Sequence, residues 1–306
     1  MPSRSRLYCT AALAALLGLL GFQVVGGMLA VMAQVVGLTH GGVTMVLTTI
    51  AQAVVFVPVA LACRDLCRMR GEYLHPPHFD LPLSMFAGIV LLFLVQSVYG
   101  VWDALLRGLE IDLRPSDTGW ISEAPLALRV ICTGLIIPVI EEFFFRGALL
   151  PALQKATGRK WLPCVAVGLL FGMVHGNLLS LPSLVVGGIL MGVVVTLTGN
   201  VWTGAAMHSA YNLTVLLISN LPRSAVSDAP AVPVSVADEL VVWLVVCGIV
   251  GAIMAGLLTA CHYTAPRAHR NKIPQGEGPG RRRWMVVAWA PAFLLAAGLL
   301  ALGQFL

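Results

Sequence analysis

Six ionisable or amide side chains interrupt three otherwise apolar stretches of the sequence. They are Glu141, Glu142, Arg146, His175, His208 and Asn212. The stretches read ICTGLIIPVIEEFFFRGALL at 131–150, FGMVH at 171–175 and MHSAYN at 207–212. Carboxylate and imidazole groups can act as general bases, and imidazole and amide N–H groups can stabilise an oxyanion. Because ionisable groups are costly in hydrocarbon, these are the first candidates for function.

Glu142 and Arg146 are four residues apart, with the acid on the N-terminal side. On a helix this is the favourable order for an ion pair, so one carboxylate can be neutralised within its own helix. Glu141 points about 100° away from Glu142, and we expect it to be unpaired and available as a general base. A second interpretation stays open, in which the two acids and the arginine form only a buried ionic lock. Pro138, three residues before Glu141, predicts a kink that opens space there.

His208 and Asn212 are also four residues apart and share one helix face. Both can donate a hydrogen bond to one ligand oxygen, which is in principle the geometry of an oxyanion hole. His175 completes a set of water-activating and oxyanion-stabilising groups, and Phe171 lies one turn earlier on the same face. Each histidine taken alone is explained about as well by a structural hydrogen bond between membrane helices.

The composition shows which solvent surrounds these side chains. The chain has 306 residues, of which 58% are hydrophobic and 11% are charged, and its mean hydropathy is +0.88. An average soluble domain has about 25% charged residues. So few polar groups cannot cover a water-facing surface of this size, which excludes an ordinary soluble globular protein.

Apolar windows long enough to cross a membrane recur along the whole chain, so we expect one all-α membrane domain over 1–306. A transmembrane helix needs about 20 apolar residues, and the windows lack the alternation of barrel strands. The predicted spans are 7–34, 41–62, 81–103, 124–154, 161–179, 181–199, 201–220, 239–260 and 285–306. The short pair around Ser180 and Leu181 could instead be a re-entrant hairpin. We therefore predict a bundle of about 8–9 transmembrane helices.

Basic residues are concentrated in alternate loops, at 4–6, 64–70, 155–160 and 262–284. The positive-inside rule makes these loops cytoplasmic and places the N-terminus in the cytoplasm. Membrane orientation thus accounts for the net charge of +5, and we expect no nucleic-acid partner. A lipid- or RNA-binding role of the last loop is a weaker alternative. High Gly, Ala, Val and Leu content without an organelle signal favours a multi-pass protein of a bacterial plasma membrane.

Three motifs occur in a fixed order, each on its own predicted span. They are EEFFFR at 141–146, FGMVH at 171–175 and HSAYN at 208–212. In this order they resemble the CAAX protease and bacteriocin-processing family of intramembrane proteases, which includes the type II CAAX prenyl endopeptidases. The likeness covers about 124–220, the expected catalytic core. The flanking spans match only in being apolar.

The resemblance implies an intramembrane endopeptidase that hydrolyses a peptide bond of a membrane-associated peptide or membrane-anchored protein. By motif position, it implies that Glu141 and His175 activate the attacking water. It further implies that His208 and Asn212 stabilise the oxyanion. Supporting roles fall to Glu142, Arg146 and Phe171.

The sequence is equivocal about a metal, although members of this family are often described as metalloproteases. There is no H-E-x-x-H motif. A catalytic zinc takes about three protein ligands, and Glu141, His175 and His208 could supply them. We favour a glutamate-based mechanism without a cofactor and keep zinc as the alternative.

Two other classes of protein remain as alternatives. A non-catalytic membrane scaffold or bacteriocin immunity protein of the same fold would tolerate Glu141→Gln, whereas an enzyme would not. An ion-coupled transporter also uses buried Glu, His and Asn at helix breaks, but it predicts inverted repeats. No matching pair of Gly/Pro-broken segments stands out in the two halves of the chain.

Overall fold

The computed structural model describes residues 3–38, 40–69, 71, 73–74, 81–113, 119–221 and 235–264. In these residues the chain is helical apart from short connections, and no strand is present. The helices are α1 (Arg4–Val35), α2 (Gly41–Leu66), α3 (Leu81–Gly108), α4 (Gly119–Glu123), α5 (Leu126–Arg129), the π-helix η1 (Val130–Ile136), α6 (Ile137–Phe144), the π-helix η2 (Phe145–Leu149), α7 (Leu150–Thr157), α8 (Leu162–Met173), α9 (Leu181–Thr198), α10 (Val201–Ser219) and α11 (Val236–Thr264). The prediction of an all-α polytopic membrane protein is confirmed.

Helices follow the predicted spans closely. Five of them, α1, α2, α3, α9 and α11, are long and apolar enough to cross a membrane. The fourth predicted span, 124–154, is an unbroken helical rod from α5 to α7. The ninth, 285–306, lies outside the described residues, as does most of the loop 262–284.

The segment 161–179 is only partly helical. α8 has 12 residues and is therefore about 18 Å long at 1.5 Å per residue, which is short of the roughly 30 Å hydrocarbon core. The remaining residues, 174–180, form a turn that leads into α9. This turn carries His175 away from regular helix, so its side chain is not fixed on the α8 surface as the sequence suggested.

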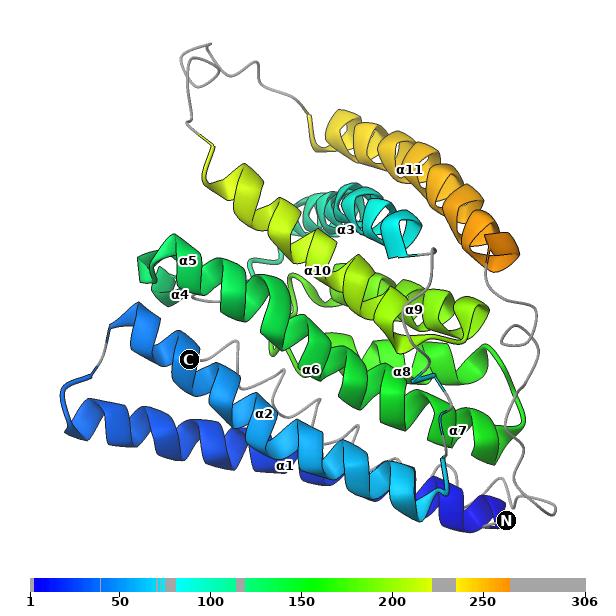
Figure 1. Ribbon diagram of the computed structural model, residues 1–306. Helices are drawn as coiled ribbons and strands as arrows, with labels where there is room; N and C mark the ends of the chain where they lie inside the picture. The colour runs from blue at the N-terminus through cyan, green and yellow to red at the C-terminus, as the bar shows by residue number, and fades with distance from the viewer. Residues whose placement is uncertain are drawn as a thin grey trace.

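The helices lie in layers across the bundle (Figure 1). α1 and α2 form an antiparallel pair, and α2 packs against α6. α10 packs on the other side of α6, α3 packs on α10, and α11 covers α3. The rod from α5 to α7 is therefore enclosed by α2, α10 and the α8–α9 pair.

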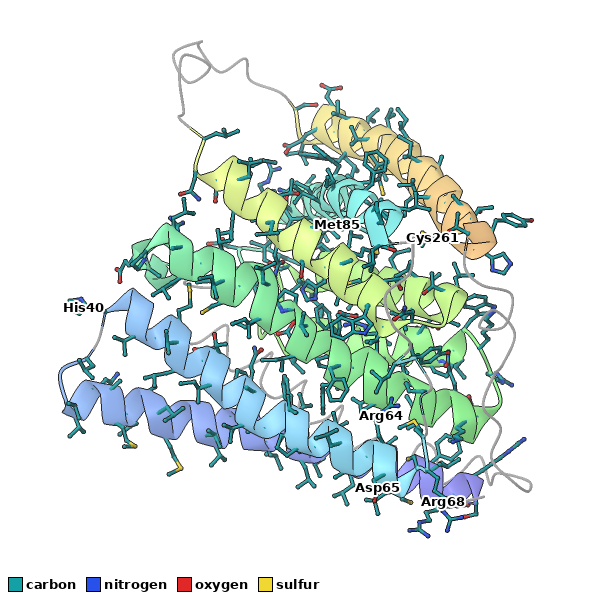
Figure 2. The ribbon with its side chains drawn as sticks, viewed as in Figure 1. His40, Arg64, Asp65, Arg68, Met85 and Cys261 are labelled. Carbon is teal, nitrogen blue, oxygen red and sulfur yellow. The ribbon has the colours of Figure 1, made fainter. Side chains whose placement is uncertain are left out.

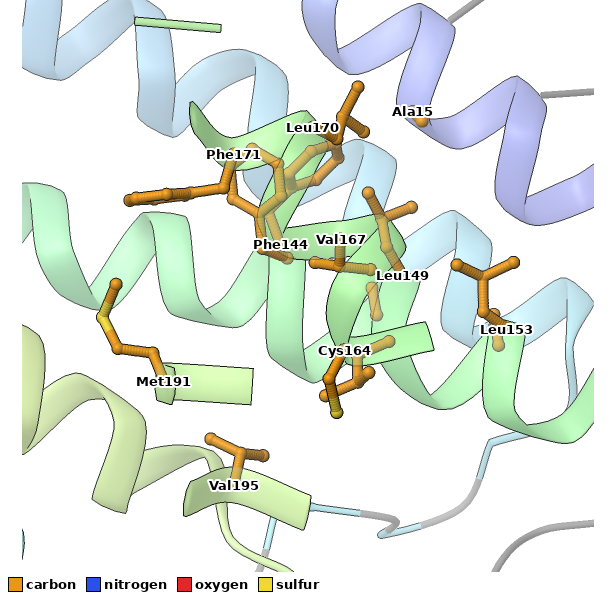
Figure 3. Close-up of a cluster of buried hydrophobic side chains, with 14 of the residues drawn as sticks. Ala15, Phe144, Leu149, Leu153, Cys164, Val167, Leu170, Phe171, Met191 and Val195 are labelled. Atoms are coloured by element: carbon orange, nitrogen blue, oxygen red, sulfur yellow. The ribbon is translucent and has the colours of Figure 1, made fainter. Parts of the chain in front are cut away.

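Buried hydrophobic side chains, among them Phe144 and Phe171, fill the interior around the rod (Figure 3). Phe144 stacks on Phe56 of α2, with ring centroids 4.5 Å apart. Phe145 meets Phe144 edge-on at 5.0 Å and Phe171 of α8 edge-on at 5.4 Å. Edge-to-face and offset rings are the favoured aromatic contacts, so this chain of rings fixes α2, the rod and α8 together.

Two glycines allow the close helix approaches on which the site depends. A Cβ at Gly168 of α8 would lie 2.7 Å from the backbone nitrogen of Ile189 on α9. A Cβ at Gly88 of α3 would collide with the carbonyl oxygen of Met207 on α10. In lipid, helices associate through such small-residue contacts because apolar surface alone gives no driving force. Gly168 thus lets α8 lie close to α9. Gly88 lets α3 lie close to α10 at Met207, which directly precedes His208.

Basic residues from separate loops gather at one end of the bundle. Arg64, Asp65 and Arg68 stand at the end of α2, and His40 stands at the opposite end (Figure 2). The Lys155 ammonium at the end of α7 donates to the carbonyl oxygens of Cys67 and Arg68, at 3.3 Å and 3.1 Å. The structure thus joins two of the predicted basic loops on one side, although which side faces the cytoplasm stays a prediction.

Candidate active site

Two π-helical stretches frame the acidic pair. Glu141 and Glu142 lie on α6, a short α-helical piece between η1 and η2. π-helices widen a helix locally and occur often at functional sites. The wide turn before Pro138 accommodates its missing N–H, so the expected kink takes the form of a π-helix within a continuous rod.

Side chains from neighbouring helices bind backbone carbonyls of both π-helices. The Asn212 amide nitrogen donates to the carbonyl oxygen of Thr133 in η1 at 2.7 Å. The Arg64 guanidinium of α2 donates to the carbonyl oxygen of Gly147 in η2. The irregular backbone around the glutamates is therefore hydrogen-bonded by α10 on one side and α2 on the other, as burial in lipid demands.

Glu142 and Arg146 form the ion pair that their spacing predicted. The guanidinium Nη1 lies 2.7 Å from Glu142 Oε1, and both side chains are fully buried. Nη2 donates to the carbonyl oxygen of Gly188 at 2.8 Å, and the guanidinium lies over the Phe171 ring, 4.5 Å from its centroid. An ion pair, a second hydrogen bond and a cation–π contact together stabilise the buried arginine.

The second carboxylate oxygen of Glu142 lies close to Gly204 of α10. Oε2 is buried without a hydrogen-bond partner among the described residues. A Cβ at Gly204 of α10 would lie 2.7 Å from it. Gly204 therefore leaves the space that Glu142 occupies.

Glu141 is not unpaired, which corrects the expectation from sequence. The Gln52 amide nitrogen, on α2, donates to Glu141 Oε1 at 3.2 Å. The other oxygen, Oε2, lies 4.0 Å from His208 Nε2. Glu141 has no partner in its own helix, but two other helices supply one each.

Gln52 is the site residue that the sequence analysis missed. It is buried, and its own Oε1 has no hydrogen-bond partner in the described part of the chain. The available signal was an amide in the middle of the apolar span 41–62. A neutral amide costs less free energy in lipid than a charge, so it is a weaker signal of function, although it too requires a hydrogen-bond partner when buried.

His208 lies between the two glutamates. Its Nδ1 is 3.2 Å from Glu142 Oε1, and its Nε2 faces Glu141. Only 6% of the residue is exposed, and the Phe171 ring contacts it edge-on at 5.7 Å. One imidazole thus joins the ion-paired acid to the acid that Gln52 holds.

His175 occupies a different position from the other motif residues. Its side chain is exposed, its Nδ1 lies 2.7 Å from the carbonyl oxygen of Phe171, and its ring stands 4.8 Å from the Phe171 ring. Among the described residues it makes no ion pair with a carboxylate, unlike His208. Phe171 therefore separates the two histidines and contacts both.

The three residues considered for zinc do not form a metal site. Within the described residues, no three His, Cys, Asp or Glu side chains are placed to hold a metal ion. Glu141 and His208 face each other, but His175 does not join them. The geometry therefore does not fit a zinc with three protein ligands, and no step is derived through one.

Comparison with known proteins agrees with the motifs. Residues 123–214 match the family model described as type II CAAX prenyl endopeptidase Rce1-like. This range begins in α4 and ends within α10, so it holds all six motif side chains and omits Gln52. No curated protein and no solved structure matches the chain. The resemblance drawn from the motifs is confirmed, because the segment that holds the candidate site is similar to the Rce1-like domain of a protease family.

Proposed function

We propose that the protein is an intramembrane endopeptidase in which Glu141 is the general base. The observation that carries this proposal is the pair formed by Glu141 and His208. These two groups lie on different helices, are almost completely buried, and face each other at 4.0 Å. Each also contacts a further side chain: Gln52 donates a hydrogen bond to Glu141, and His208 Nδ1 lies 3.2 Å from Glu142 Oε1.

The separation of 4.0 Å suits a shared water molecule. A polar pair just beyond hydrogen-bond distance can be bridged by one water that bonds to both. In the proposed reaction, the oxygen of this water attacks the peptide carbonyl carbon and its proton passes to Glu141. Glu141 then gives the proton to the departing amine as the C–N bond breaks, leaving a carboxyl and an amine terminus.

The position of His208 supports an oxyanion-stabilising role. Its Nδ1 lies 3.2 Å from Glu142 Oε1, which holds the ring, and its Nε2 faces Glu141 across 4.0 Å. A ring N–H at this position can donate to the oxyanion. The Asn212 amide bonds to Thr133 through one N–H and keeps a second N–H for the oxyanion.

The role of His175 rests on its motif position alone. Its exposed ring, on the turn after α8, can contact a substrate at the edge of the site. We propose that it assists Glu141 when a substrate orders this turn. The geometry favours His208 over His175 as the closer partner of Glu141.

We propose a membrane-anchored peptide or protein as the substrate, in a bacterial plasma membrane with the N-terminus cytoplasmic. The site is buried in a bundle that includes five helices long and apolar enough to cross a membrane, so a scissile bond would reach it from lipid or along the bundle. In this proposal the lipid bilayer surrounds the protein and supplies its substrate.

The experiment that tests the proposal compares membranes from cells that express the wild type or Glu141→Gln at matched levels, with peptide termini labelled. Glu123→Gln, an exposed acid of α4, is the matched control. New termini that appear with the wild type and the control but not with Glu141→Gln would identify both the activity and the substrate. If no terminus depends on Glu141 under several growth conditions, the protein is a scaffold, an immunity protein or a transporter instead.

A further inference from the structure

A polar pocket is lined by residues of α3, α9 and α10 and of the turn that leads into α9, close in sequence to the motif residues of α10. Its volume is about 350 Å³, at the lower end of the range for ligand-binding pockets. It is lined by Val95, Gln96, Tyr99, Ser180, Ser183, Leu184 and Tyr211. Five of these seven residues carry a hydrogen-bonding side chain, a high proportion in a chain of which 58% is hydrophobic.

Three of the polar side chains have no hydrogen-bond partner among the described residues. Gln96, Tyr99 and Tyr211 make no hydrogen bond within the described residues, whereas the Ser183 hydroxyl donates to the carbonyl oxygen of Ser180 at 2.7 Å. Gln96 is exposed and Tyr99 and Tyr211 are partly buried, so all three side chains are accessible from the pocket. A polar group without a protein partner hydrogen-bonds water or a ligand. Their convergence on one pocket therefore indicates a hydrogen-bonding occupant.

The residues that line the pocket carry no charged side chain. Hydroxyl and amide groups both donate and accept hydrogen bonds, so they match the alternating N–H and C=O groups of a peptide backbone. A phosphate or carboxylate would require a basic partner, and the lining residues include none. Asp103, one turn beyond Tyr99 on α3, is paired with Arg107 at 3.0 Å. The chemistry therefore favours an uncharged peptide segment.

Two of the elements that carry motif residues, α10 and the turn after α8, also reach this pocket. Tyr211 follows His208 by three residues on α10 and directly precedes Asn212. Ser180 ends the turn that begins after α8 and holds His175, and the Trp102 indole of α3 donates to the carbonyl oxygen of Leu178 in that turn at 3.2 Å. The pocket thus adjoins the site through one helix and one turn.

We propose that this pocket is a substrate subsite, in which Gln96, Tyr99 and Tyr211 hydrogen-bond the backbone of the peptide segment next to the scissile bond. The proposal rests on the proposed function and adds where the substrate chain binds. Backbone contacts of this kind position a substrate without selecting its side chains.

The test measures kcat and KM of the full-length protein in nanodiscs, with Tyr211→Phe and Tyr99→Phe compared with the wild type. The probe is an internally quenched peptide ending in farnesylated cysteine, two valines and a serine. A peptide that spans the cut found by terminus labelling replaces it if the wild type does not cleave it. Tyr263→Phe, an exposed tyrosine of α11, is the matched control.

We expect each pocket variant to raise KM about three- to tenfold, the size of one or two lost hydrogen bonds, with kcat within about twofold of the wild type. Thermal stability should not change, because these hydroxyls bond to nothing in the described protein. Shortening the peptide on the side that enters the pocket should remove the difference between variant and wild type. Unchanged KM in an active enzyme overturns the subsite alone, whereas activity that does not depend on Glu141 overturns the proposed function.

Discussion

Gln52 of α2 donates a hydrogen bond to Glu141 of α6 across 3.2 Å, between residues 89 positions apart in the chain. The bond fixes one carboxylate oxygen and leaves the other turned toward His208. A general base must hold its reactive oxygen in one place, and a side chain on a neighbouring helix can do this without touching the substrate. Gln52 is in this sense a positioning residue.

Replacing Gln52 with methionine should lower kcat about tenfold while KM stays nearly constant. The two side chains have similar length, so packing is kept while the charged hydrogen bond, worth roughly 1.5–3 kcal/mol, is lost. Steady-state kinetics with the quenched peptide measure the split between kcat and KM.

Thr49→Val provides the control for Gln52→Met. Thr49 is buried on the same helix, but its hydroxyl bonds only to the carbonyl oxygen of Met45 at 2.8 Å. Equal losses in both variants would mean that any change in α2 disturbs the enzyme, and Gln52 would then have no special role. In the Glu141→Gln background, Gln52→Met should have no further effect on turnover.

Glu141→Gln should reduce turnover by about 10²- to 10⁴-fold, the usual contribution of a general base. The amide keeps the shape of the carboxylate but cannot accept the proton of the attacking water. The thermal unfolding midpoint should stay close to that of the wild type, because the Gln52 contact can be kept by rotating the amide. A variant that cleaves at the wild-type rate would exclude Glu141 as the base.

Arg146→Met should strongly reduce the amount of folded protein. Removing one partner of a buried ion pair leaves the other charge uncompensated, which costs roughly 3–5 kcal/mol. The double variant Glu142→Gln, Arg146→Met should recover part of this loss, because neither charge is then left unpaired. Thermal unfolding in detergent measures both.

The exposed pair of Arg107 and Glu239 serves as the control for the buried one. Arg107 Nη2 lies 2.8 Å from Glu239 Oε2, but both side chains are partly exposed, one near the end of α3 and the other near the start of α11. Arg107→Gln should therefore change stability only slightly, because solvent screens exposed charges. If Arg146→Met is equally mild, the buried pair is not a structural requirement of the site.

The local part of this site could be predicted from the sequence, and the long-range part could not. The Glu142–Arg146 pair follows from helix spacing, since residues four apart meet on any helix. The Gln52–Glu141 contact depends on how α2 packs against α6, which no local pattern encodes. The separation of His175 from Glu141 likewise follows from the early end of α8 at Met173, whereas the apolar pattern continued to 179.

Hydrophobicity predicted the spans well because length and apolarity are what the bilayer requires. It could not show η1 and η2, since a π-helix has the same composition as the α-helix around it. The carbonyls of Thr133 and Gly147 are bonded by side chains from other helices, so these irregular turns are stabilised by tertiary contacts.

Chelators should leave proteolysis intact. Of the three zinc candidates, only Glu141 and His208 face each other, and no three suitable side chains of the described residues are placed to hold a metal ion. Activity is measured after incubation with 1,10-phenanthroline and after addition of zinc. Loss that zinc restores would show a metal-dependent enzyme and would remove the glutamate-only mechanism.

Gly204→Ala should impair the site without touching an ionisable group. The new methyl would stand 2.7 Å from Glu142 Oε2 and 2.6 Å from a Val195 methyl, so both side chains or α10 itself must shift. Overpacking of this kind costs roughly 1–3 kcal/mol, and a shifted Glu142 would also release His208 Nδ1. Gly256→Ala on α11, where a methyl meets nothing within 4 Å, is the control and should be neutral or slightly stabilising. If both variants keep wild-type activity and stability, Glu142 has room to adjust, and its position does not determine that of His208.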